Sequence, residues 1–174
     1  MLRLHETLLD VPVLSLRTGG QVAIATKMII NPNNLKVLGW YVNDRFSSDE
    51  LILLSGDVRE ISSKGIIIND HEVLSEPEEL VRHKEVLEVD YDLMGKKVVS
   101  ESGKKYGKVT DFSVETGGMI IKKVYASQSI IKDFSGGNLS IDRNQIIEIT
   151  RSKVIIKNPT EKSSATAAST VPAR

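Results

Sequence analysis

The most informative segment of the chain reads Tyr106-Gly107-Lys108-Val109-Thr110-Asp111-Phe112-Ser113-Val114. It places a run rich in β-branched and aromatic residues directly after one glycine, and a second glycine, Gly103, lies just upstream. Glycine adopts a positive φ without strain, so we expect Gly103 and Gly107 at a hairpin-like turn that leads into a strand. The segment therefore predicts an antiparallel β unit in the second half of the chain.

Short runs of the same kind recur along the rest of the sequence. Clusters rich in Gly, Asn, Pro and Ser separate them, which is typical of strands joined by turns. The turn clusters are Thr18-Gly19-Gly20, residues 31–34, Thr116-Gly117-Gly118 and residues 135–138. The other expected strands are residues 22–30, 36–42, 66–68, 120–125, 146–150 and 154–156. This pattern predicts an all-β fold of the sandwich or barrel type.

The strand pattern occurs twice. Residues 51–62 and 139–150 share an arrangement of apolar residues 88 positions apart, and Val13-Leu14-Ser15 precedes Val98-Val99-Ser100 by 85 positions. We interpret the chain as two copies of one β unit, over about residues 10–70 and 93–157. The alternative is two unrelated sets of strands that share only their composition.

A short helix is expected between the two copies. Ser75 can cap it, Pro77 suits its first turn, and Glu78 lies at the capping-box position three residues after Ser75. We expect this helix to run from Ser75 to about Glu85, inside a linker of residues 75–92. A helix of this length is unstable alone, so it must pack on one or both β units.

The composition changes after Lys157. Residues 158–174 contain one β-branched aliphatic residue, Val171, and no aromatic residue. Such a segment cannot bury enough apolar surface to offset the entropy of ordering, so we predict a disordered tail.

We expect this tail to be dispensable for folding. A chain that ends at Asn158 should melt at the same temperature as the full chain, because residues 159–174 have almost nothing to bury. Thermal melting of the two chains measures this. A midpoint many degrees lower in the shortened chain would show that the tail packs on the fold.

The second β unit resembles the PRC-barrel family. The resemblance rests on Met94-Gly95-Lys96-Lys97-Val98, on Ser102-Gly103, on residues 106–114 and on the turn, strands and acidic positions that follow over residues 116–149. The first unit looks like a diverged copy, with Ala23-Ile24-Ala25-Thr26 where the second has Gly107-Lys108-Val109-Thr110.

This resemblance implies two tandem small β-barrels, each six-stranded and partly open, over residues 1–74 and 93–157. Barrels of the family occur in the H subunit of photosynthetic reaction centres and in ribosome maturation factors of the RimM type, where they dock other proteins and do not catalyse. This chain lacks the membrane helix of the former and the additional β-barrel domain of the latter. The resemblance thus implies a stand-alone tandem PRC-barrel protein and transfers neither specific role.

The residues give no support to catalysis, a metal or a cofactor. The absence of cysteine excludes a disulfide scaffold, a Cys-ligated zinc site and a thiol nucleophile. Asp70-His71-Glu72 has metal-ligand residue types, but neighbouring side chains on an extended chain point to opposite sides, which favours a solvated loop. The glycine clusters precede strands and lack the Lys-Ser/Thr ending of a phosphate loop. We therefore expect a protein that is not an enzyme.

Charge is divided unevenly along the neutral chain. Residues 1–92 carry 9 basic and 16 acidic residues, whereas residues 93–157 carry 12 basic and 6 acidic residues. The candidate partner contacts in the basic half are Lys96, Lys97, Lys104, Lys105, Tyr106 and Lys108. A basic strip with an aromatic residue can contact RNA phosphates and stack a base, but solvated lysines that protect a sheet edge give the same pattern.

Trp40 is the remaining candidate contact. It is the single tryptophan of the chain. A lone tryptophan in a small barrel favours packing in the core or between domains, whereas an exposed one would serve as an anchor for a partner.

Two functional hypotheses follow. The first is a non-enzymatic adaptor of two PRC-barrel modules that binds a protein partner, and the alternative is an RNA-associated factor in ribosome maturation or RNA processing. No apolar run approaches the ~20 residues of a membrane helix, and His5, Glu6 and Asp10 make the start unlike a signal peptide. We therefore expect a cytoplasmic protein without a membrane span. The partner and the oligomeric state stay open.

Overall fold

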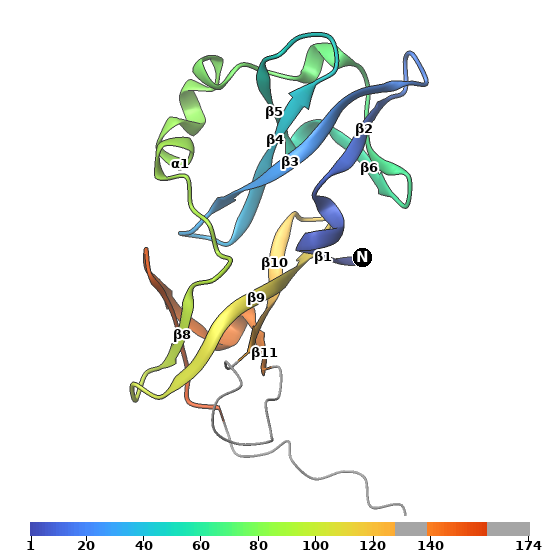
Figure 1. The fold of residues 1–174 in the computed structure, drawn as a ribbon. Coiled ribbons are helices and arrows are strands. Elements are labelled where there is room, and N and C mark those ends of the chain that lie inside the picture. The colour runs from blue at the N-terminus through green and yellow to red at the C-terminus, as the bar shows by residue number, and fades with distance from the viewer. Residues whose placement is uncertain (128–138, 160–174) are drawn as a thin grey trace, which may run out of the picture.

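The computed structural model describes residues 1–127 and 139–159. Strands dominate this part of the chain and form one sheet of 13 strands (Figure 1). The seven strand positions expected from the sequence are all occupied by strands. The expected turn at residues 135–138 and most of the predicted disordered tail lie outside the described residues.

The first half of the chain begins with a short N-terminal strand, and six further strands follow it. Their bounds are β1 (Leu2–Leu4), β2 (Val11–Ser15), β3 (Gln21–Asn31), β4 (Lys36–Asp44), β5 (Glu50–Leu54), β6 (Val58–Ser62) and β7 (Gly65–Ile68). The second half has β8 (Lys97–Ser100), β9 (Lys105–Glu115), β10 (Ile120–Ser127), β11 (Leu139–Asp142), β12 (Ile146–Ile149) and β13 (Lys153–Ile156). We call β2 to β7 the first β unit and β8 to β13 the second β unit.

The two β units pair their strands in the same order. The first unit has the order β5-β4-β3-β2-β7-β6, and the second has β11-β10-β9-β8-β13-β12. In each unit the first and the last strand in chain order pair in parallel, β2 with β7 and β8 with β13, while the other neighbours are antiparallel. The order of pairing that the internal pattern predicts is thus present in both units.

Local backbone geometry is also alike at corresponding positions of the two β units. Leu35 and Met119 both have a positive φ, at 53° and 50°, in the turns between the two longest strands of each unit. Thr26 donates a hydrogen bond to the carbonyl of Tyr41, and Thr110 donates one to the carbonyl of Tyr125. A residue with a side chain adopts positive φ only at some energetic cost, so the shared positions indicate the same turn geometry in both units.

The structure does not confirm the expectation of two separate, partly open barrels. Among the described residues neither unit joins its outer strands, β5 with β6 or β11 with β12, so the sheet stays open. The units are also joined: β4 pairs with β10 at Lys36 and Ile120, and β1 crosses to pair with β9. Their buried side chains form one continuous hydrophobic cluster. Because strand pairs and a common hydrophobic core link the two units, they form one extended sheet.

The linker differs from the expected helix. It contains the 3₁₀ turns η4 (Pro77–Glu79) and η5 (Val81–His83) and then a short α-helix, α1 (Lys84–Val89). The helix does not start at Ser75, because Ser75 forms a backbone bridge to Ile52 of β5, with hydrogen bonds of 2.8 and 3.0 Å that hold it extended. The carboxylate of Glu79 accepts a hydrogen bond from the Glu76 amide, so the first turn begins one residue later.

His5 lies where the N-terminal segment packs on the second unit. Its ring stacks on Phe112 with centroids 4.4 Å apart, and Asp111 lies 3.9 Å from Nδ1. Burial lowers the pKa of His5 despite the raising influence of Asp111, Asp92 and Glu6. The folded protein therefore prefers the neutral imidazole.

We predict that protonation of His5 destabilises the fold. Its pKa in the folded state lies below the unfolded value of about 6.5, so the unfolded chain binds the extra proton first as the pH falls. The free energy of unfolding should decline as the pH drops from about 7.5 to about 5, with a slope of at most about 1.4 kcal/mol per pH unit from this group. Urea unfolding at several pH values tests this. His5→Phe, which keeps the stacked ring, should remove that part of the slope, and equal slopes in the two proteins would contradict the prediction.

Candidate functional site

A groove on the second β unit brings together lysines from three strands. Cross-strand neighbours lie side by side on one face of a sheet. Lys153 of β13 pairs with Lys97 of β8, and Lys97 pairs with Lys108 of β9. The three exposed lysines therefore form a row across the sheet, which we call the lysine row.

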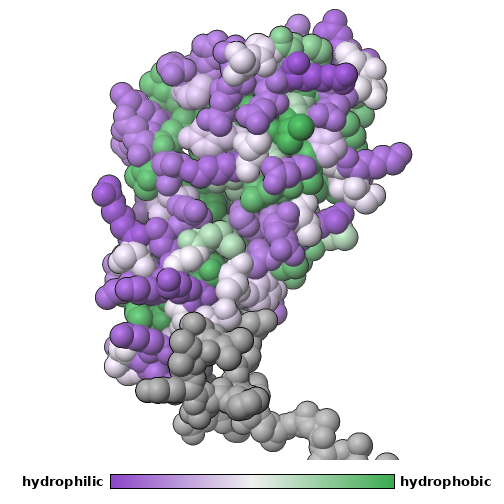
Figure 2. Space-filling view, in the orientation of Figure 1, coloured by the Kyte–Doolittle hydropathy of each residue, from purple (hydrophilic) through white to green (hydrophobic). Residues whose placement is uncertain are grey.

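The groove around this row has a volume of about 870 Å³. Its walls combine the lysine row with Lys105 and with backbone or side-chain atoms of Val98, Val99 and Val109. At the lower left of Figure 2, where β8 and β9 lie in Figure 1, hydrophobic surface is flanked by hydrophilic residues. We call this surface the lysine groove.

A β-bulge in β9 sets the direction of its lysines. Lys97 pairs with Lys108 and Val99 pairs with Lys105, so three steps along β9 match two along β8. Without the extra residue, Lys105 and Lys108 would point to opposite faces, because side chains alternate along a strand. Gly107, inside the bulge, has φ 95°, and Gly103 in the preceding turn has φ 84°, as expected from the sequence. The bulge thus turns both lysines toward the groove.

The lysine row is electrostatically unfavourable by itself. Like charges placed directly opposite on neighbouring strands repel. Among the described residues, no carboxylate forms an ion pair with Lys97, Lys108 or Lys153. A bound anion would relieve this repulsion, so the groove is suited to an acidic ligand.

The structure divides the lysine strip expected from the sequence. Lys97, Lys105 and Lys108 line the groove, whereas Lys96 and Lys104 do not. The Lys96 ammonium donates a hydrogen bond of 2.5 Å to the Arg151 carbonyl and lies 5.2 Å from the ring centre of Tyr91. Burial raises the pKa of the Tyr91 hydroxyl to about 12.

Tyr106 lies beside Lys104, the other expected lysine that is outside the groove. Its ring centre lies 5.5 Å from the ammonium of Lys104, and neither residue lines the groove.

Lys153 is the groove residue that sequence reasoning missed. The parallel pairing of β13 with β8 brings it beside Lys97 from 56 positions away. The run Lys153-Val154-Ile155-Ile156, read as a strand, was the only available signal.

Trp40 is a core residue. Its side chain is fully buried, and in the sheet it pairs with Met28 of β3 and Leu53 of β5, which are buried as well. It has no exposed surface to offer a partner. The preferred interpretation from the sequence, packing in the core, matches its position.

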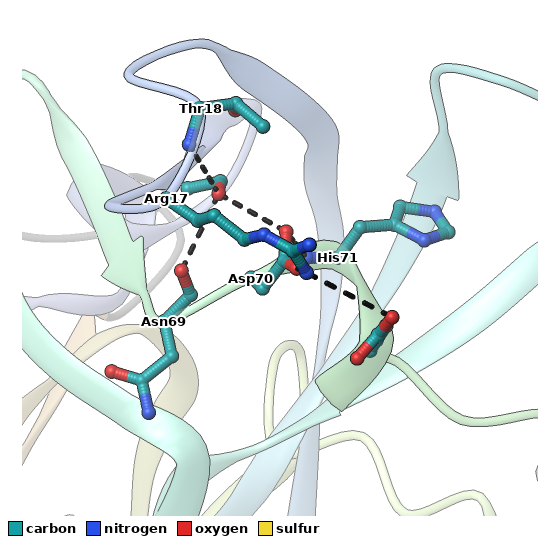
Figure 3. A network of polar contacts seen from close by, with 7 residues as sticks. Arg17, Thr18, Asn69, Asp70 and His71 are labelled. Carbon is teal, nitrogen blue, oxygen red and sulfur yellow. Dashed lines mark hydrogen bonds and ion pairs between the residues drawn. The ribbon is translucent and has the colours of Figure 1, made fainter.

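The acidic cluster at residues 70–72 forms ion pairs and hydrogen bonds within the protein. Asp70 accepts hydrogen bonds from Arg17 at 2.6 Å and from Ser15 at 3.3 Å, while the His71 ring points away from this pair (Figure 3). His71 Nε2 instead lies 2.7 Å from Asp44. Burial acts against the charge of Asp44, but hydrogen bonds from His71 and Ser47 keep its pKa below the ordinary value.

The segment is not extended as expected from the sequence, because a 3₁₀ turn, η3 (His71–Val73), follows Asp70. Asp70 and Glu72 both lie near Arg17, at 2.6 and 3.9 Å, whereas His71 pairs with Asp44. In the described part of the chain, no three His, Asp or Glu side chains converge to hold a metal ion. In the same residues, no helix has the length and apolar character needed to cross a membrane.

Residues 86–162 match the PRC-barrel domain family. The match spans the end of the linker and the whole second β unit, including every strand that lines the lysine groove. The second half of the chain is therefore similar to PRC-barrel domains, in agreement with the resemblance seen in the sequence. A comparison with curated proteins found no match to the chain.

Proposed function

We propose that this protein is a non-enzymatic docking module that binds an acidic segment of a protein partner in the lysine groove. The observation that carries the proposal is the lysine row: three cations held side by side, without ion-pair partners in the described residues, beside the partly exposed Val99. Cations beside apolar surface fit a peptide that offers both carboxylates and apolar side chains.

The spacing of the row suggests the form of the ligand. Neighbouring strands lie about 4.8 Å apart, so the row spans roughly 10 Å. In an extended peptide, residues two apart lie roughly 6.6 Å from each other on one side of the chain. Two acidic residues at alternate positions can thus lie between three lysines, with the intervening apolar residues directed toward Val99.

The first β unit is proposed as a diverged PRC-like unit that does not share this contact. The same pairing order and the same positive-φ turn positions support this relationship. Pro12, Gln21 and Ile24 take the places of Lys97, Lys105 and Lys108 at the corresponding offsets of 84 or 85 residues. The cationic face is therefore confined to the second unit.

RNA binding is the weaker alternative. Nonspecific binding of single-stranded nucleic acid commonly combines a basic groove with aromatic rings on which bases stack. Among the residues that line the lysine groove, none is aromatic and none is arginine. The groove thus offers cations to phosphates without a stacking surface.

A peptide-binding experiment tests the proposal. The probe is a fluorescent peptide of about eight residues, of the extended type in which side chains alternate, with glutamate at every second position and valine between. Control probes are the same peptide with glutamine for glutamate, and an oligouridylate of equal length. We expect the glutamate peptide to bind, with an affinity that declines as salt is raised. Equal binding of the glutamine peptide would contradict the role of charge, and tighter binding of the oligouridylate would favour the RNA alternative.

A further inference from the structure

The linker carries apolar side chains that the fold leaves unburied. None of the residues in η4, η5 or α1 is fully buried. Val81 is 75% exposed and Val89 is 45% exposed. Apolar residues in so short a segment normally pack inward, because a helix of six residues gains little stability from its own hydrogen bonds. The linker therefore presents an apolar surface without a partner within the described chain.

A cleft lies between this segment and β4. It has a volume of about 570 Å³, within the range of about 300–1,000 Å³ typical of ligand sites. Its apolar lining comes from Tyr41, Pro77, Leu80, Val81 and Leu87. On the side of the molecule where α1 lies, Figure 2 shows hydrophobic surface interleaved with hydrophilic surface.

Acidic side chains line the same cleft. Glu78 and Glu88 contribute to it, and its one cation, Lys84, lies 3.7 Å from Glu88 and is partly neutralised by it. Residues 76–90 as a whole contain six acidic and two basic residues. The cleft therefore favours cations beside apolar groups, the opposite of the lysine groove.

The segment is tied to the first unit by contacts outside the cleft. Lys27 of β3 and Asp90 form an ion pair of 2.6 Å, and Ser75 forms the backbone bridge to Ile52. These contacts hold both ends of the linker, so the cleft exists before a ligand arrives. A preformed site avoids part of the ordering cost of binding.

We propose that this cleft, here called the acidic cleft, binds a basic amphipathic segment of a protein partner. Apolar side chains of that segment enter between Tyr41 and Leu87 and cover Val81, while its lysine or arginine side chains contact Glu78 and Glu88. This is a second docking surface, independent of the lysine groove and of opposite charge.

The test uses the full chain and a fluorescent helical peptide with leucines at the i, i+3 and i+4 spacing and lysines on the other face. A scrambled peptide of equal composition lacks the apolar face and serves as the control probe. We expect the amphipathic peptide to bind more tightly than the scrambled one. Val81→Asp and the double variant Glu78→Lys with Glu88→Lys should each weaken binding about fivefold or more, and both change exposed residues, so the fold should persist.

Two controls isolate the site. Leu16→Asp changes a residue that is 62% exposed outside the cleft and should leave binding unchanged. The triple variant Lys97→Ala, Lys108→Ala and Lys153→Ala alters the lysine groove and leaves the acidic cleft intact. Unchanged binding of the amphipathic peptide by this variant separates this proposal from the proposed function. Undiminished binding by Val81→Asp would overturn the proposal. Sedimentation of the chain alone as a dimer that Val81→Asp dissociates would also overturn it, since the occupant would then be a second copy.

Discussion

Trp40→Ala should lower the free energy of unfolding by ~3–5 kcal/mol, the range found when large buried aromatic residues are truncated. The Trp40 ring is fully buried in the continuous core and lies between Met28 and Leu53 in the sheet. Small domains have a total stability of about 5–15 kcal/mol, so the loss would be a large share. Denaturant unfolding, followed by circular dichroism because the tryptophan signal is removed, measures the change.

Trp40→Phe is the matched variant. The indole Nε1 is buried and has no hydrogen-bond partner among the described groups. Phenylalanine retains most of the apolar contact and removes this unpaired donor, so it should cost less than half as much as alanine. An alanine variant as stable as the wild type, but defective in binding a partner, would contradict the core assignment and make Trp40 an interface residue.

Removing the lysine row should weaken binding of the glutamate peptide about tenfold to a hundredfold at low salt. The variant combines Lys97→Ala, Lys108→Ala and Lys153→Ala, and each exposed ion pair contributes up to about 1 kcal/mol. The fold should persist, because substitutions of exposed lysines have small effects on stability and the change relieves repulsion between neighbours. Fluorescence anisotropy measures the affinity.

The matched control removes three exposed lysines that do not line the groove: Lys36, Lys64 and Lys122. It changes the net charge equally, so it separates a local contact from the overall field of the protein. At about 0.5 M salt the two triple variants and the wild type should converge, since exposed charges are then strongly screened. Equal weakening by both variants at low salt would show that only net charge matters.

The strands and the positive φ of Gly103 and Gly107 could be predicted from the sequence because their signals are local. β-branched runs between turn clusters gave the strand positions, and Gly103 and Gly107 have the positive φ values expected of them. The linker could not be predicted from its capping residues. Ser75 has a residue type suited to a cap, but its backbone bridge to Ile52 depends on a tertiary contact.

The composition of the lysine groove was only partly accessible for a similar reason. Lys97, Lys105 and Lys108 are close in sequence, but their grouping apart from Lys96 and Lys104 depends on side-chain alternation and on the bulge. Lys153 joins them through a parallel strand pairing, which no local pattern specifies. Likewise, the joining of the two units into one sheet depends on the pairing of β4 with β10 and of β1 with β9, both between distant segments.

An NMR titration of the isotope-labelled full chain with the glutamate peptide tests the docking surface most directly. The proposed contact predicts the largest amide shifts at groove residues of β8, β9 and β13, namely Lys97, Val99, Gly107, Lys108 and Lys153. It also predicts no comparable shifts in the first unit, at Ile24 and at the residues on either side of Pro12. These residues have the same place in the strand order as the groove residues, but Pro12 and Ile24 stand where the second unit has lysines. Shifts centred on the first unit, or spread evenly over exposed lysines of the whole chain, would contradict the lysine groove as the docking site.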